Sequence, residues 1–283
     1  MRKLLLLTFM AIFIPIIIPC KVYAVDISVG AITWYVWQER AYTEGEADIL
    51  KFSIDPTFFY GPVVSVKFND DFDLTFVYLY GKSDEKKGID AIIDDPINGP
   101  YLFHVPLRFK YKRQDADITL SYSLNDYFKI FAGIKYIGYS MIIIPISEAP
   151  DKLLEDPTKH NGFGPGLGLS ATVPIIGNLF LIGNVSGIYL WGRVKGPAYY
   201  SYYDAGYVEV IKNEDAKYKE RGVNSALQLA YYIAPASIII TLGGRFQYIV
   251  TEYYDRTANM AICAHNETKF YGITLTATYN FNI

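Results

Sequence analysis

The final stretch of the chain, residues 270–283, alternates between two kinds of side chain. The odd-numbered positions, from Tyr271 to Ile283, are apolar and mostly large. The even-numbered positions between them are mostly Gly, Thr and Asn. A period of two places the two sets on opposite faces of a β-strand. This stretch is therefore predicted to be a strand with one apolar face, which fits a soluble sandwich or a membrane barrel.

Similar alternation recurs along the chain, and short turns alternate with long connections between the segments. Short turns at one end and long loops at the other are typical of outer-membrane barrels, and an even strand number lets the sheet close. We therefore predict an all-β, antiparallel up-and-down barrel of about 10 strands, with 12 as the alternative. The predicted strands cover residues 25–37, 50–68, 72–81, 101–123, 127–139, 166–173, 179–191, 223–232, 238–250 and 270–283. The predicted long loops cover residues 38–49, 82–100, 141–164, 193–221 and 251–267.

Two strands carry irregularities. Pro56 and Pro62 lie on the apolar face of the second predicted strand, where they indicate bends or bulges. In residues 101–123 the apolar positions change from odd to even numbers near Asp115. A bulge near Lys112–Arg113 explains the change and turns every charge inward. A turn at Arg113–Asp115 is the alternative, and it changes the strand count.

The N-terminus reads as a cleaved secretory signal. Arg2 and Lys3 precede an apolar stretch, and residues 22–24 resemble a small-residue cleavage site. We expect residues 1–24 to be the signal peptide and residues 25–283 to be the barrel. Cys20 raises lipidation as an alternative, although Pro19 departs from the small residue usual before a lipidated cysteine.

Composition narrows the class of protein. Aromatic residues make up 16% of the chain and charged residues 19%, a combination that suits a barrel with aromatic girdles. The formal net charge is −3 before the signal is removed, which argues against nucleic acid as a partner. After cleavage only Cys263 remains, so no intrachain disulfide is expected. No spacing of residues predicts a metal site or a cofactor.

The chain resembles the small bacterial outer-membrane β-barrel proteins over residues 25–283. The most specific element is the terminal strand, where Tyr279, Phe281 and Ile283 resemble the assembly signal read by the barrel-insertion machinery. Ile283 stands where that family usually ends in Phe. The resemblance implies a multi-pass barrel in the outer membrane of a Gram-negative bacterium, with lipid and the insertion machinery as partners.

Charged residues on the predicted polar faces are the leading functional candidates. A charge facing lipid costs a few kcal/mol, so we expect these side chains to line the lumen. A basic, water-filled lumen predicts a porin-like passive channel for small, possibly anionic, solutes. A lumen filled by side chains is the competing interpretation, because ten strands enclose little space. The expected pore-lining residues are Lys51, Asp55, Arg108, Lys110, Lys112, Arg113, Asp115, Asp117, Lys135 and Arg245.

The loops suggest a second class of function. Residues 199–207 are rich in tyrosine, and Tyr199, Tyr200, Tyr202 and Tyr203 are candidates for contacting a ligand or partner. The same tyrosines also fit an interfacial girdle. The alternative function is therefore a closed barrel that presents surface loops for binding or adhesion.

Enzymatic activity is the remote alternative. Ten strands is also the number found in the omptin proteases, which use paired acids facing a His–acid pair at the rim. Asp94 and Asp95 could meet His160 or His265 there, but the chain contains no Asp-x-His motif. No GxSxG or other nucleophile motif is present either. We therefore predict no enzyme, with a rim hydrolase as the least favoured function.

Overall fold

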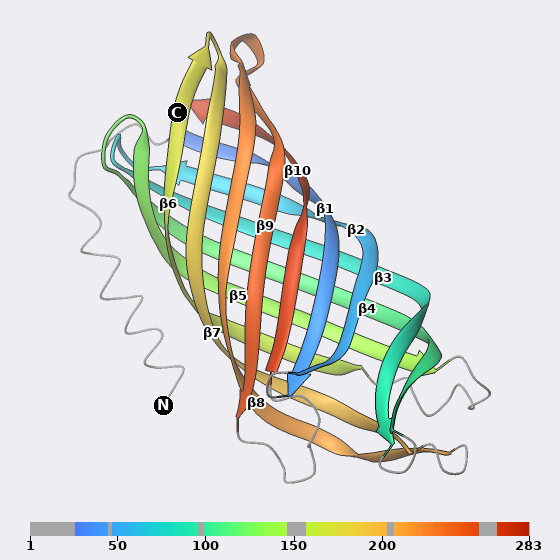
Figure 1. Cartoon of the computed structure of the whole chain (residues 1–283). Helices are drawn as coiled ribbons and strands as arrows, with labels where there is room; N and C mark the ends of the chain where they lie inside the picture. Colours follow the sequence, from blue (N-terminus) through green and yellow to red (C-terminus); the bar gives the residue numbers. More distant parts are fainter. Residues whose placement is uncertain are drawn as a thin grey trace, which may run out of the picture.

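A computed structural model describes residues 26–44, 47–95, 99–145, 157–202, 207–254 and 265–282. These residues form a closed antiparallel barrel in which ten strands follow one another in chain order, as Figure 1 shows. Among them, no helix is long and apolar enough to cross a membrane. The predicted signal peptide lies outside the described residues.

Each strand pairs with its sequence neighbours, and the barrel closes through the first and last strands. β1 pairs with β10 in one unbroken register from Asp26↔Asn282 to Thr43↔His265. The prediction that an even strand number lets these two strands meet is confirmed. The strands are β1 (Asp26–Glu44), β2 (Ala47–Lys67), β3 (Phe72–Asp95), β4 (Gly99–Ser123), β5 (Phe128–Pro145), β6 (Thr158–Ile176), β7 (Leu179–Tyr202), β8 (Tyr207–Ile233), β9 (Ile238–Tyr254) and β10 (His265–Asn282), with a 3-10 turn, η2 (Ala234–Ala236), before β9.

The predicted short turns lie together at one end of the barrel, beside the start of β1 and the end of β10 (Figure 1). Two of them use the same local chemistry. Asn69 accepts hydrogen bonds from the backbone N–H groups of Asp71 and Phe72 through its side-chain oxygen, and Asn125 repeats this pattern in the β4–β5 turn. A side chain that closes its own turn in this way fixes the register of the strands on both sides.

The two faces of the wall differ as the alternation predicts. Outward side chains are apolar along a continuous belt, for example Leu242, Ile273 and Leu275, all of which are exposed. The part of each strand within this belt is its membrane-spanning segment. The belt ends where outward charges begin, at Glu39 in β1, Lys82 in β3 and Arg221 in β8. Beyond these points the strands stand outside the bilayer.

The two faces should tolerate charge differently. Leu275→Arg places a charge on the outward face in the membrane segment, and we expect it to cost about 2–4 kcal/mol at mid-bilayer. Thr276→Arg is the matched control, because Thr276 is half-buried on the inward face. Ile240 and Thr241 repeat the comparison in β9. The yield of refolded, heat-modifiable barrel in lipid measures the difference, and equal yields would contradict the assignment of the faces.

The strands run much further than the sequence predicts. Most of the predicted loop 82–100 is a β-hairpin, because β3 and β4 pair continuously to Asp95↔Gly99. The predicted loop 193–221 is likewise the paired outer part of β7 and β8, up to Tyr202↔Tyr207. The prediction of loops was wrong because it kept charged segments out of the strands, whereas an outward charge is costly only where the strand faces lipid. Above the bilayer a ladder can carry polar side chains on both faces.

β4 contains no bulge, so that prediction is wrong too. Its ladders run unbroken through Lys112 and Arg113 on the β3 side and on the β5 side. The apolar pattern changes phase because the surroundings change. Near the turns, outward Ile118 and Leu120 face lipid, whereas further out the inward Phe109 and Tyr111 are buried in the lumen. The turn predicted as the alternative is also absent, since β4 is one strand.

β2 contains the irregularity that Pro56 predicts. The pairing of β1 with β2 shifts by one residue between Val36 and Gln38, so that Asp55 and Pro56 together lie opposite Trp37. An extra residue of this kind is a β-bulge. Pro62, in contrast, keeps the regular register opposite Ala31. The bulge exchanges the two faces of β2, and Ile54 consequently points inward and is buried.

Candidate functional site

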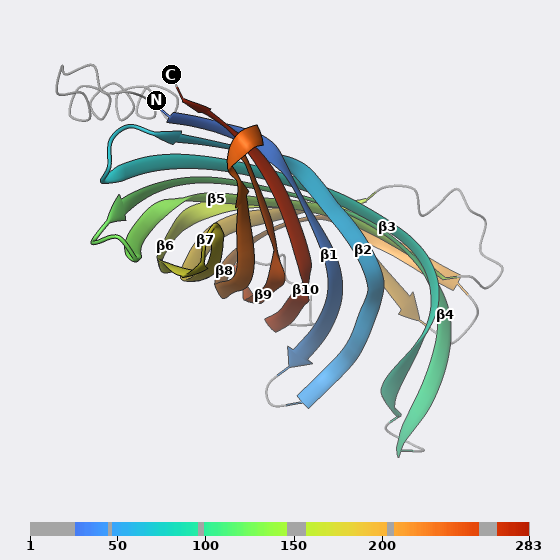
Figure 2. The same cartoon turned by 90° about the horizontal axis from the view of Figure 1, so that it is seen from above.

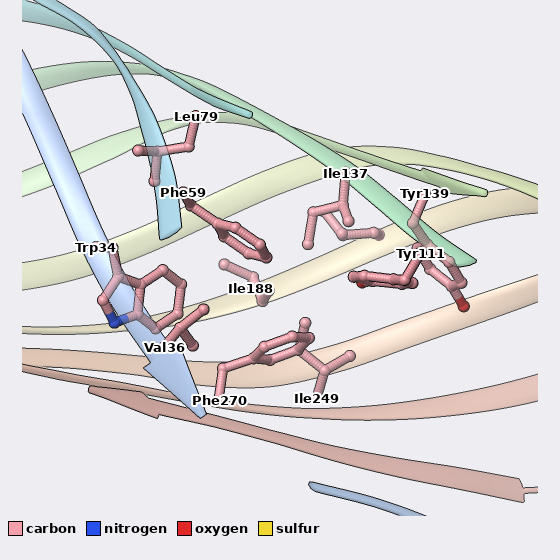
Figure 3. Packing of buried hydrophobic residues seen from close by; sticks show 11 residues of the cluster. Trp34, Val36, Phe59, Leu79, Tyr111, Ile137, Tyr139, Ile188, Ile249 and Phe270 are labelled. Atoms are coloured by element: carbon pink, nitrogen blue, oxygen red, sulfur yellow. The ribbon is translucent and has the colours of Figure 1, made fainter. Parts of the chain in front are cut away.

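The middle of the lumen is filled with large side chains from strands all around the barrel, as Figure 3 shows. Trp34 contacts Phe59 edge to face at 5.8 Å and Phe270 at 6.2 Å between ring centroids. Gly81 lets the Phe59 ring enter, because a Cβ at this position would meet the ring at 1.7 Å. The cluster also contains Val36, Leu79, Tyr111, Ile137, Tyr139, Ile188, Leu190 and Ile249.

One hydrogen bond crosses the full width of the lumen. Arg113 of β4 donates to the side-chain oxygen of Gln247 in β9 at 2.7 Å. These two strands are five places apart in either direction around the ten-stranded wall. The Arg113 guanidinium also lies over the Phe270 ring, at 4.0 Å from its centroid. A solute path at this height is therefore blocked by side chains in contact.

The crossing arginine belongs to a network of buried charges. Arg113 makes two hydrogen bonds to Asp115, at 2.7 and 2.8 Å, and the two side chains are only 2% and 1% exposed. Lys135 contacts Asp117 at 2.8 Å and Asp115 at 3.8 Å. Arg245 lies over the ring of Trp34 at 4.6 Å. These five charged residues lie on the inward face, and ion pairs join four of them, Arg113, Asp115, Lys135 and Asp117. Their role as pore-lining residues stays a prediction.

The other predicted pore-lining residues lie elsewhere. Lys110 and Lys112 lie on the outward face of β4, and Arg108 lies there as well, paired with Asp84 of β3. Their expected inward position was wrong, because it rested on the β4 bulge. Asp55 lies in the bulge of β2 and is exposed.

The remaining predicted site residues are those of the tyrosine-rich loop, the assembly signal and Lys51. The side chains of Lys51, Tyr199, Tyr200 and Tyr202 lie outside the described part of the structure, as do Tyr203 and Ile283. Tyr279 and Phe281 lie on the outward face of β10, and their role in assembly stays a prediction.

Above the filled layer lies a second polar group that the sequence analysis missed. Glu220 of β8 accepts a hydrogen bond from Thr251 at 3.3 Å, and its other oxygen has no partner among the described residues. Arg40 of β1 lies over the rings of Tyr111 and Tyr139. A cavity of about 10 Å³ lies between these side chains. Arg40 and Glu220 were missed because both fall in predicted loops, although the alternation of β1 and β8 continues through them.

The buried Glu220 should make stability depend on pH. Burial raises the pKa of its carboxyl from 4.5 to about 7, although Arg113 acts in the opposite direction. A raised carboxyl pKa means that the folded barrel binds this proton more tightly than the unfolded chain. The contribution of Glu220 to the free energy of unfolding is therefore complete below about pH 4.5 and is lost as the pH rises to about 7. The total loss is up to roughly 3 kcal/mol, because each pKa unit corresponds to about 1.4 kcal/mol.

The measurement is the urea midpoint of the folded barrel in detergent between pH 4 and pH 8. Glu220→Gln should flatten the part of the profile that lies between the two pKa values. Glu252→Gln is the control, because Glu252 is half-exposed and paired with Arg221. Identical profiles for wild type and Glu220→Gln would show that Glu220 does not titrate in this range.

The two histidines considered for the rim hydrolase lie in different surroundings. His160 is buried, and its ring stacks on Tyr139 with centroids 4.1 Å apart. His265 lies 3.7 Å from Glu267 on β10. The side chains of Asp94 and Asp95 lie outside the described residues, so the predicted rim pair is not described. The described residues also hold no group of three metal-ligating side chains.

Above the membrane segment the wall is open between β2 and β3. Their ladder ends at Phe59↔Gly81, while β2 continues to pair with β1 as far as Ala47. β3 continues to pair with β4 as far as Asp95, and Figure 2 shows this hairpin diverging from β2. Among the described residues, two hydrogen bonds cross the opening: Thr57 donates to the carbonyl oxygen of Lys82, and the Asp55 N–H donates to Glu85, both at 2.9 Å.

Comparison with known proteins supports this architecture. No family model matches the chain, and no curated protein matches it by sequence. The crystal structure of outer membrane protease OmpT from Escherichia coli matches with a TM-score of 0.57 and 13% identity, over 91% of this chain and 97% of OmpT. The chain has the fold of a bacterial outer-membrane β-barrel. At this identity the likeness to OmpT extends to the fold and not to its activity.

Other outer-membrane barrels match with lower scores. Neisserial surface protein A matches with a TM-score of 0.33 and 10% identity, over 90% of this chain and 97% of that protein. The toluene transporter TodX of P. putida matches with a TM-score of 0.30 and 11% identity, over 92% of this chain and 90% of TodX. For an outer-membrane barrel, the end with short turns faces the periplasm and the long hairpins face outward. On this general rule we expect the opening between β2 and β3 to lie on the cell surface.

Proposed function

We propose that this outer-membrane barrel is closed and acts at the cell surface by binding extended polypeptide segments along the open wall between β2 and β3. The observation that carries this proposal is that the β2–β3 ladder ends at Phe59↔Gly81 while both strands continue beyond it, each in a ladder with its other neighbour. The contact of Arg113 with Gln247 across the lumen supports a closed barrel rather than the passive channel. The proposal develops the alternative of a closed barrel that binds at its surface.

The chemistry of the opening suits a polypeptide. Above Phe59↔Gly81, β2 has a ladder only with β1, and β3 has one only with β4. An unpaired edge presents a row of backbone N–H and C=O groups, which is a template for an additional strand. Main-chain hydrogen bonds supply the affinity in such strand addition, so binding tolerates many sequences.

An incoming strand can replace the two hydrogen bonds that cross the opening. Each joins one backbone group to one side chain, and both involve exposed residues. An incoming strand offers backbone partners for the same groups, Asp55 N–H and Lys82 C=O, at little net cost. The ligand class is therefore an unfolded or extended polypeptide segment, and a folded domain without a free strand should not bind.

A covalent bridge across the opening tests this proposal. Asp55→Cys and Glu85→Cys are combined in a Cys20→Ser/Cys263→Ser background and joined by a short bifunctional maleimide. The probe is a reduced and alkylated, fluorescently labelled protein chain that cannot fold, and anisotropy measures its binding. We expect roughly micromolar affinity without the bridge and at least tenfold weaker binding with it, because the bridge closes both edges.

The matched control is the same bridge between Arg193→Cys and Asp215→Cys, which form an exposed ion pair on the closed β7–β8 ladder. It should leave binding unchanged. Equal affinity of the bridged and unbridged opening would contradict the proposal. Mass spectrometry of the probe after binding separates binding from catalysis, since cleavage that stops on bridging would favour the rim hydrolase instead.

A further inference from the structure

The charged group in the middle of the lumen contains more bases than acids. The bases are Arg113, Lys135 and Arg245, and the acids are Asp115 and Asp117. Ion pairs join Arg113 and Lys135 to the two acids. The group therefore carries one positive charge that its own acids do not balance. Charges inside a protein are normally paired, because removing them from water is costly.

Arg245 is the base of this group that lacks an acidic partner. Within the described part of the chain its guanidinium makes no ion pair and no hydrogen bond, and it lies over the ring of Trp34. Further out in the lumen, Arg40 and Glu220 are one base and one acid, so they leave the balance unchanged. The Arg245 side chain is partly exposed although it points inward, which means that solvent reaches it.

The ring beneath Arg245 brings a second unused donor to the same place. Trp34 is completely buried, and its indole N–H has no hydrogen-bond partner among the described residues. Figure 3 shows the indole nitrogen on the side of the ring that is turned away from Phe59. Buried donors without a partner are rare, and each one costs free energy. Because the indole N–H lies on the rim of the ring that the guanidinium covers, one acceptor can contact both donors.

The neighbours of Arg245 leave space beside its side chain. Its partners across the two ladders are Ala226 of β8 and Gly272 of β10, which carry a methyl group and no side chain. The filled layer closes the lumen on the outer side of this rung. Towards the short turns, the inward Thr276 and Thr278 are small and partly exposed. A small ion therefore reaches Arg245 from the end of the barrel with the short turns.

We propose that Arg245 and Trp34 bind one small monovalent anion, such as chloride, on the turn side of the filled layer. The guanidinium supplies the charge, and the indole N–H supplies a further hydrogen bond. One negative charge completes the balance of the group, whereas a divalent anion would bring one charge too many. The bound anion stabilises the closed lumen. The site does not depend on the opening between β2 and β3.

Iodide quenching of Trp34 fluorescence tests the proposal, since iodide is a monovalent anion that quenches indole on contact. The chain has three tryptophans, so Trp37→Phe/Trp191→Phe leaves Trp34 as the only one. In the folded barrel we expect quenching that saturates at roughly millimolar iodide and that chloride reverses by competition. Caesium, a cationic quencher, should leave the emission unchanged. Quenching that rises linearly without saturation would show collisions alone and would overturn the site.

Arg245→Gln in the same background should weaken iodide binding at least tenfold, because it removes the charge that holds the anion. The matched control is Lys129→Gln, which removes another inward base, one that is bound to Asp73 near the turns. It should keep the iodide affinity within twofold, and a heat-modifiable gel shift confirms that each variant is folded. Equal losses in the two variants would mean that only the total charge of the lumen matters, which contradicts a site at Arg245.

A second measurement needs no substitution. The urea midpoint of the wild-type barrel should be higher in sodium chloride than in sodium gluconate of the same ionic strength, because only the folded barrel binds the small anion. Gluconate is too large for the space beside Arg245. Arg245→Gln should have the same midpoint in both salts. A wild-type midpoint that does not differ between the two salts would refute the proposal, even where Arg245→Gln fails to fold.

Discussion

Asp115→Asn (D115N) is expected to destabilise the folded barrel by about 3–5 kcal/mol, the usual cost of removing one partner from a buried ion pair. The Arg113–Asp115 pair is almost completely buried and makes two hydrogen bonds. Asn keeps the shape of the side chain but removes its charge. Arg113 would then lie in the lumen beside Lys135 without the carboxylate that separates their charges.

Asp84→Asn is the matched control, because Asp84 also binds an arginine through two hydrogen bonds but is half-exposed. Solvent screens this pair, and its loss should cost about 0–1 kcal/mol. Urea unfolding of both variants in the same lipid or detergent measures the difference. If the two substitutions cost the same, the network in the lumen does not hold the barrel together as its geometry indicates.

The contrast between these two pairs also shows what the sequence could and could not predict. Arg108 and Arg113 lie five residues apart on one strand, and the alternation alone places them on opposite faces. The sequence analysis nevertheless turned both inward, because it treated outward charge as unfavourable along the whole strand. The cost of that charge depends on height above the bilayer. The period of two predicts the faces, but it does not show where the lipid ends.

Features set by local chemistry were predicted well. Asn69 and Asn125 close short turns through their own side chains, and Pro56 lies in a bulge. The alternation of residues 270–283 predicts the last strand, which closes the barrel against β1. Each of these depends on a few neighbouring residues. The strand number follows from them, because short turns can be counted along the chain.

The state of the lumen could not be predicted, because it depends on contacts between distant residues. Arg113 and Gln247 are 134 residues apart, and they meet only when the register of every strand around the barrel is known. Trp34, Phe59 and Phe270 are inward positions, and their volume fills the space that ten strands enclose. The sequence therefore left a narrow pore and a filled lumen as alternatives.

Single-channel recording of the refolded barrel in a planar bilayer should give no conductance steps in the wild type. Phe270→Ala/Gln247→Ala should give discrete steps. Phe270 and Gln247 form one inward rung of the β9–β10 ladder, and both contact Arg113. The double substitution removes the Gln247 side chain, which accepts the hydrogen bond across the lumen, and the Phe270 ring, over which Arg113 lies. Water can then reach Arg113, whose charge should favour anions in a salt gradient.

The neighbouring rung supplies the matched control. Tyr271 and Phe246 pair one residue further along the same two strands, but they face outward and are exposed. Tyr271→Ala/Phe246→Ala removes similar volume from the lipid face and should leave the barrel folded and silent. Conductance in the control would mean that steps arise from a loosened wall. Steps with anion preference in the wild type would restore the passive channel, with Arg113, Lys135 and Arg245 as the residues that select the solute.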